Sequence, residues 1–377
     1  MALVTAFGVG CFHFGVRKSA PFHFSGEEYL KELRDALQSI PSISNIQCEN
    51  ESRLKAMQFP VEYDPPNIHD DKGIFPYVQR FDLTFTVYIP FRVQERLARI
   101  EAAPDFSTER STEHFRVYMI YNYFFPVTFV ELLSPDATTS PSDAVRIVRE
   151  FLKEEMGRYK GEYLEFQFLG PSPLHGNFYI LTEPRQEAKE AITLKVTRTP
   201  GYSTIEYWVD ETRDLNQARA AVFFRTVREL GFFYHWHNAQ YWLWHEWEGL
   251  QELVTDVMAI QRKRGAFAAV QRLLRTGTIT RDLRLALAEF GQAYVFGKSA
   301  YQINMQGIYS TLKGESLRHF IEDGVEDITY PIKEIGDVVE FFETRTLKRV
   351  ENLVIVIAAL LGGVVGSLMT ILLGRLF

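Results

Sequence analysis

The sequence predicts an α+β cytosolic domain followed by an all-α region, a long stalk helix and one C-terminal transmembrane helix. Three observations support this order. Residues 1–210 alternate β-branched and aromatic segments with segments of helical spacing, residues 211–330 have helical patterning almost throughout, and the chain ends in an uncharged apolar stretch. We therefore expect an α+β sensor domain over 1–210, a helical domain over 211–330, and the stalk with its transmembrane helix over 331–377.

The first 210 residues contain recognisable strand and helix segments. Residues 80–93 and 114–132 are rich in β-branched and aromatic residues, as strands are, whereas residues 27–40 and 142–156 have helical spacing, with Ser142 as the expected N-cap. Two hairpin-like pairs follow these segments, 163–170 with 177–183 and 191–198 with 203–210. These segments predict a domain built on antiparallel strands.

The stalk helix is expected to begin near Pro331 and to continue without a break to Gly374, over roughly 65 Å. An earlier helix is expected to start at an Asp214 cap and to stop at Gly231. Apolar residues of the stalk are spaced in steps of four and three, which is a heptad-like seam suited to packing against copies of itself. They are Ile328, Ile332, Ile335, Val339 and Phe342.

The last part of the chain has the length and composition of a membrane span. Leu353–Gly374 contains 22 residues without charge, which is roughly 33 Å of helix against a hydrocarbon core of about 30 Å. Arg345, Lys348 and Arg349 precede it and only Arg375 follows it. Because basic residues favour the cytoplasmic side, we expect the body in the cytoplasm and the C-terminus across the cytoplasmic membrane.

Small residues recur every four positions in this segment. Such a face lets helices pack closely, so we expect a homo-oligomer whose helices line a narrow pore. The residues of this face are Ala358, Gly362, Gly366, Thr370 and Gly374.

The junction of stalk and span resembles the end of the stalk helix in CorA-type metal-ion channels. Arg345, Thr346, Val350, Ile357 and Ala358 carry the resemblance. It implies an oligomeric cytosolic body, a helical stalk and a central pore helix. The Gly-Met-Asn signature and the second span of that family are missing, so the resemblance does not extend to magnesium transport. The overall layout is similar to that of membrane effectors of bacterial anti-phage systems, such as the Hailong system, whose soluble crown binds a DNA oligomer.

A basic cluster in the helical region is the candidate ligand site. An acidic chain with a net charge of −7 excludes a globally basic nucleic-acid binder but not a local phosphate-binding surface. A solvated helix face is the simpler alternative. Trp244, in a segment with four of the five tryptophans, is expected to offer a stacking surface, although the same segment also suits packing between domains. The basic candidates are Arg262, Lys263, Arg264, Arg272, Arg275, Arg281 and Arg284.

No catalytic or metal-binding motif is found in the sequence. The two cysteines form neither a disulfide framework nor a zinc spacing, and Gly291–Ser299 has one residue too many for a phosphate-binding loop. We therefore expect a non-enzymatic, cofactor-free homo-oligomeric membrane effector or ion channel in anti-phage defence, gated by a ligand such as single-stranded DNA or a nucleotide from a partner enzyme. The alternative is a tail-anchored enzyme or scaffold.

Overall fold

The structure is a computed structural model that describes most of the chain. The residues described are 2–17, 24–56, 58–59, 81–100, 112–121, 126–133, 140–168, 176–183, 192–199, 201–212, 214–263, 265–311, 316–324 and 329–373. Within helices, the side chains of 266–274, 362–373 and a few single positions lie outside this description. The chain forms two compact units, one of residues 1–239 with 303–326 and one of residues 240–302 with 327–377.

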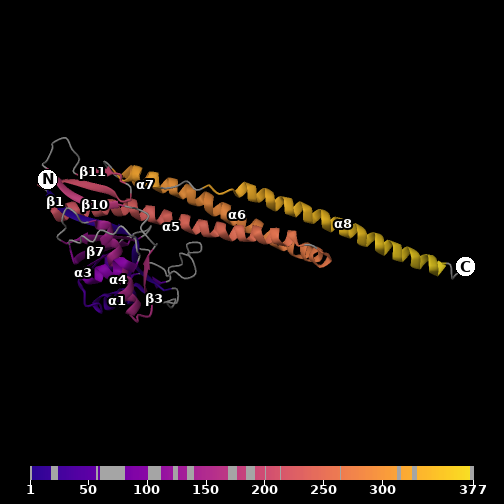
Figure 1. Cartoon of the computed structure of the whole chain (residues 1–377), viewed down its shortest axis with the longest axis horizontal. Helices are drawn as coiled ribbons and strands as arrows, with labels where there is room; N and C mark the ends of the chain where they lie inside the picture. The colour runs from indigo at the N-terminus through magenta and orange to yellow at the C-terminus, as the bar shows by residue number, and fades with distance from the viewer. Residues whose placement is uncertain are drawn as a thin grey trace. The chain divides into compact units, whose positions relative to one another are not determined.

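The first unit is built on a large sheet (Figure 1). The sheet has eight strands in the order β11-β12-β10-β1-β8-β7-β6-β4. Neighbouring strands are antiparallel except β10 and β12, which run parallel. Two-stranded pairs form between β2 and β9 and between β3 and β5. The strands are β1 Ala2–Gly10, β2 Phe12–Val16, β3 Phe24–Ser25, β4 Ile43–Glu49, β5 Gln58–Phe59, β6 Phe81–Tyr88, β7 His114–Tyr121, β8 Val127–Leu132, β9 Leu164–Phe168, β10 Gly176–Glu183, β11 Ile192–Thr197 and β12 Ser203–Asp210.

Eight helices are found in the described residues. They are α1 Gly26–Gln38, α2 Glu51–Lys55, α3 Phe91–Ile100, α4 Pro141–Arg158, α5 Leu215–Arg262, α6 Ala266–Thr311, α7 Arg318–Gly324 and α8 Ile332–Leu373. Three of them, α5, α6 and α8, are much longer than the others. Together with the sheet, the helices confirm the α+β body that the sequence predicts.

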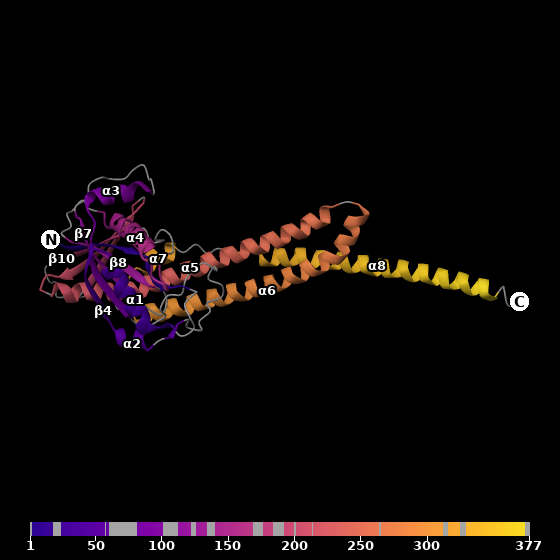
Figure 2. The ribbon, with the colours of Figure 1, turned by 90° about the horizontal axis from the view of Figure 1, so that it is seen from below.

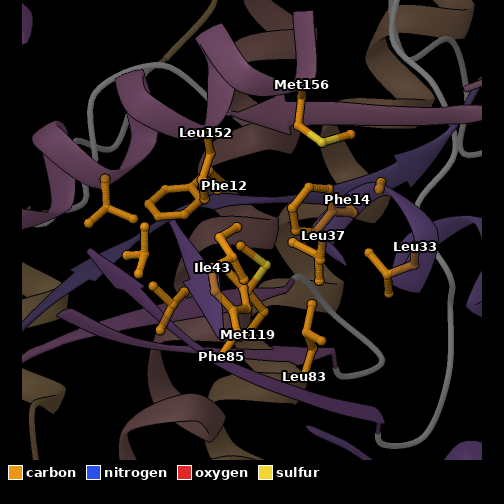
Figure 3. Packing of buried hydrophobic residues seen from close by; sticks show 14 of the residues in the cluster. Phe12, Phe14, Leu33, Leu37, Ile43, Leu83, Phe85, Met119, Leu152 and Met156 are labelled. Atoms are coloured by element: carbon orange, nitrogen blue, oxygen red, sulfur yellow. The ribbon is translucent and has the colours of Figure 1, made fainter. Parts of the chain in front are cut away.

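One face of the sheet is covered by α1 and α4 (Figure 3). Helix α1 begins at a capping box, in which the Ser25 hydroxyl accepts from the Glu28 N–H and the Glu28 carboxylate accepts from the Ser25 N–H at 2.7 Å. From this start, Leu33 and Leu37 fall on the buried face of the helix. They pack with Phe85 of β6 and other strand residues in the larger core.

The opposite face of the sheet is covered by the first part of α5 and by α7. Alternate strand residues such as Phe7 of β1 and Phe129 of β8 point to this face, as the two-residue period of a strand requires. Phe223 of α5 lies between them, with its ring centroid 4.9 Å from that of Phe7 and 4.3 Å from that of Phe129. The sheet is therefore buried on both sides by helices.

Several sequence-based boundaries differ from the structure. Helix α4 begins after an N-cap at Ser140, slightly before the predicted cap. Helix α5 continues through Gly231. A single glycine costs a helix only about 1 kcal/mol, which the buried side chains of Leu230 and Phe233 on either side offset. Strand β9 pairs with β2 and not with β10, so the first predicted hairpin is wrong.

The predicted C-terminal transmembrane helix is wrong for the residues that the structure describes. None of the helices there is both long enough and apolar enough to cross a membrane. Helix α8 is continuous over Ile332–Leu373, as the stalk prediction required, but its first half carries many charges. The predicted placement of the C-terminus across the cytoplasmic membrane depends on that helix and is overturned with it.

Gly26 gives a prediction about how α1 is seated. A Cβ at this position would lie 1.7 Å from the backbone carbonyl oxygen of Leu54, a group that cannot move aside as a side chain does. We expect Gly26→Ala to lower the free energy of unfolding by about 2 kcal/mol, because the overpacked helix must shift. In Gly157→Ala the new Cβ meets nothing within 4 Å, so this control should be stabilised by about 0.5 kcal/mol. Urea unfolding of both variants tests the contact, and equal midpoints would contradict it.

Candidate anion-binding surface

The second unit contains an antiparallel pair formed by the end of α5 and most of α6. The ring of Trp247 lies 5.2 Å from that of Phe290, and the Gln261 amide donates to the Thr276 hydroxyl at 3.1 Å. From the first contact to the second, α5 advances from Trp247 to Gln261 and α6 goes back by the same number of positions, from Phe290 to Thr276. This register places Arg275 level with Arg262 at the end of the pair.

Helix α8 joins this pair and runs in the same direction as α5. Its predicted seam packs within the unit, since Val339 is buried in a cluster with Leu243 of α5 and Leu283 of α6. Further along, Arg349 donates to the Gln261 side-chain oxygen at 3.1 Å. The same glutamine therefore contacts both α6 and α8 and holds the three helices together next to Arg262.

Basic residues from all three helices meet at this end of the unit. Arg262, Lys263 and Arg275 are exposed, and Arg349 lies beside them through its bond to Gln261. We call these four residues the basic end. Lys348 and Arg345 are exposed on the adjoining turn of α8. Guanidinium and ammonium groups gathered at one end of the unit create a positive potential that attracts phosphate groups, even in a chain of net charge −7.

The structure divides the predicted basic set. Arg281 pairs with Asp282 at 3.6 Å and Arg284 pairs with Glu343 of α8 at 2.7 Å. These two arginines therefore have acidic partners on the surface, which reduces their contribution to an anion site. Arg264 and the side chain of Arg272 lie outside the described residues.

Trp244 is not part of the same site. About five turns of α5 separate it from Arg262, which is roughly 27 Å along a helix. Its side chain is half exposed, and its indole N–H donates to the Glu248 carboxylate at 2.9 Å. His245 also contacts Glu248, with Nδ1 3.1 Å from Oε2. The prediction of a base-stacking role beside the arginines does not fit this spacing.

No protein-family model, curated protein or solved structure matches the chain. The site must therefore be interpreted from its own chemistry. Among the described residues, no group of three or more His, Cys, Asp or Glu side chains is arranged to hold a metal ion.

The predicted small-residue face on α8 falls mainly outside the described residues. Ala358 is exposed. The side chains of Gly362, Gly366 and Thr370, and the whole of Gly374, are not described.

Sequence reasoning missed Arg349 as a member of the candidate site. It was interpreted as part of the basic flank of a membrane span, since it lies far from Arg262 in the chain. A usable signal was present in the seam of α8, whose apolar residues imply a packed helix. The seam alone does not say which helices it packs against, and the register of α5, α6 and α8 was needed to bring the basic residues together.

Proposed function

We propose that the chain is a non-enzymatic binding protein that takes a single-stranded oligonucleotide through its phosphates at the basic end. The observation that carries this function is the pair of hydrogen bonds at Gln261, with Thr276 and with Arg349, which brings basic residues of three helices to one end of the unit. A pore is not part of the proposed function, because it would require the membrane-spanning helix.

An oligonucleotide suits this surface better than a mononucleotide. Three of the four basic residues come from three different helices and Lys263 directly follows α5, and all four are exposed or half-buried. A polymer with regularly spaced phosphates can contact several of them at once, and each contact releases condensed counterions. Because phosphate contacts carry no sequence information, binding should depend little on base sequence.

Charge reversal at the basic end tests the proposal. In Arg262→Glu with Arg275→Glu, we expect the affinity for a fluorescent single-stranded DNA to fall more than tenfold. Each reversal removes an attraction of about 1 kcal/mol and adds a repulsion of similar size, and about 1.4 kcal/mol corresponds to a tenfold change. Fluorescence anisotropy at low salt measures the affinity.

A matched control separates the local surface from net charge. Lys31→Glu with Arg92→Glu changes two exposed residues of the first unit. Both double variants take the net charge from −7 to −11, since each substitution changes it by −2. The control should bind within about twofold of the unmodified protein, because its charges lie outside the proposed surface and are screened over about 10 Å. Equal losses in the two variants, or no binding by the unmodified protein, would refute the proposed surface.

A further inference from the structure

The exposed part of α8 carries a second heptad seam, distinct from the one packed within the unit. Five apolar residues follow one another in steps of three, four, three and four: Leu347, Val350, Val354, Ile357 and Leu361. All five are exposed, at 69%, 40%, 58%, 45% and 61%. This spacing places them along one stripe of a helix. We call this stripe the outer seam.

The outer seam begins at the point on α8 where packing against α5 and α6 ends. Val339 and Phe342 pack with α5 and α6, and Arg349 makes its bond to Gln261 just before α5 ends at Arg262. Beyond this point α8 extends past the end of the α5–α6 pair in both views (Figures 1 and 2). No other described part of the unit is available to cover the seam there.

The same spacing continues to the end of the helix. Val364, Leu368 and Ile371 follow Leu361 in steps of three, four and three, and the helical backbone reaches Leu373. The register from Leu347 to Ile371 thus extends over more than three heptads. Seams of this length are typical of coiled coils, whereas a single exposed apolar side chain on a monomer is ordinary.

We infer that the outer seam binds the same seam of further copies of this chain in a parallel coiled coil of more than two helices. With Leu347 at position a, three of the four a positions are leucine and every d position is valine or isoleucine. Leucine at a with a β-branched residue at d favours trimers and tetramers over dimers. A copy of the chain is the occupant that the pattern specifies, since a heptad seam is complementary to another of equal length.

Leu360 supports a bundle of more than two helices. It occupies position g beside the seam and is 64% exposed. In a two-stranded coil position g lies at the edge of the interface, whereas additional helices cover it. Burial of this side chain would therefore favour the larger assembly. The inference is independent of the oligonucleotide proposal, because the basic end and the outer seam contain different residues.

The mass of the full chain in solution tests the inference. We expect sedimentation equilibrium to give three or four times the 43.7 kDa of one chain. In Val354→Lys with Ile357→Lys the mass should fall to that of one chain, because both charges enter the seam. The matched control is Ile355→Lys with Val356→Lys, whose side chains are 59% and 55% exposed but lie off the seam. It should keep the mass of the unmodified assembly.

Three outcomes would overturn the inference. A monomeric mass for the unmodified chain at micromolar concentration would show that the seam is covered by another molecule and not by further copies of the chain. A dimer would contradict the number of helices. Equal dissociation of the two lysine variants would show that association depends on general apolarity and not on the heptad register. Circular dichroism of each variant confirms that the body remains folded.

Discussion

Replacing Arg219 with alanine is expected to lower the free energy of unfolding by roughly 3 kcal/mol, at the lower end of the cost of breaking a buried ion pair. Its guanidinium donates to both oxygens of Glu131 at 3.1 and 3.3 Å. Glu131 is 4% exposed and also accepts from the Thr5 hydroxyl at 2.8 Å and the Tyr118 hydroxyl at 3.0 Å. Removing the arginine leaves the carboxylate buried without its nearest positive charge.

The expected loss is large because α5 and three strands meet at this carboxylate. Thr5 lies on β1, Tyr118 on β7 and Glu131 on β8, so the pair fastens α5 to the middle of the sheet. In Arg219→Ala the midpoint temperature of thermal unfolding should fall by about 10 °C for a unit of this size.

Arg158→Ala is the control for Arg219→Ala. It removes a surface arginine whose side chain is 67% exposed and which pairs with Glu155 in the same helix. Exposed pairs of this kind contribute less than about 1 kcal/mol. A loss for Arg219→Ala no greater than for Arg158→Ala would contradict the structural role of the pair.

Glu229→Gln is expected to stabilise the first unit above pH 7 by about 3 kcal/mol, the free-energy equivalent of the raised pKa of this carboxyl. The Glu229 side chain is 2% exposed. Its carboxylate accepts from the Leu317 N–H, just before α7, at 3.2 Å. Burial raises its pKa from 4.5 to about 7, although the Leu317 bond and the Arg225 charge oppose this rise. A glutamine keeps an acceptor for Leu317 without the cost of a buried charge.

The pH dependence follows from the sign of the shift. Because the folded state raises the pKa of Glu229, its contribution to stability is fully present below about pH 4.5 and is lost as the pH rises through 7. The unmodified protein and Glu229→Gln should therefore have similar free energies of unfolding near pH 4.5. Their free energies of unfolding should diverge toward pH 8, where Glu229→Gln is the more stable.

The difference between the unmodified protein and Glu229→Gln must be measured, since His13 acts in the opposite direction. Burial lowers the pKa of His13 from 6.5 to about 3, so its contribution is lost as the pH falls below 6.5. Subtracting the free energies of unfolding that the two urea curves give at each pH removes the His13 contribution, which both proteins share. A difference that is constant from pH 4.5 to 8 would contradict the shifted pKa of Glu229.

The sequence predicts the α+β body because its strands are short, aromatic and β-branched and helices α1 and α5 have clear caps. The Ser25–Glu28 capping box and the Asp214 side chain, which accepts from the Asn216 N–H at 3.1 Å, are local features that need no tertiary information. Strand pairing is different. The partner of β9 is β2, close to the start of the chain, and nothing in a local pattern specifies a partner so distant in the sequence.

The C-terminal helix shows why composition alone was insufficient there. An apolar stretch has the same hydropathy whether it contacts lipid or the apolar side chains of other helices. Only around Leu347 and Val350, where charged and polar residues alternate with the apolar ones, does the sequence mark one stripe of this helix. Likewise, the basic residues of the candidate site were visible one by one, but their grouping depends on the register in which α8 packs on α5 and α6.

The salt dependence of oligonucleotide binding tests the central claim, that the basic end is a phosphate-binding surface, most directly. If its four residues each neutralise one phosphate of a single strand, the logarithm of the affinity should fall with the logarithm of salt concentration at a slope of about 3. In Arg262→Glu with Arg275→Glu the slope should fall to about 1.5. A slope near zero for the unmodified protein, or an unchanged slope in this variant, would contradict the account.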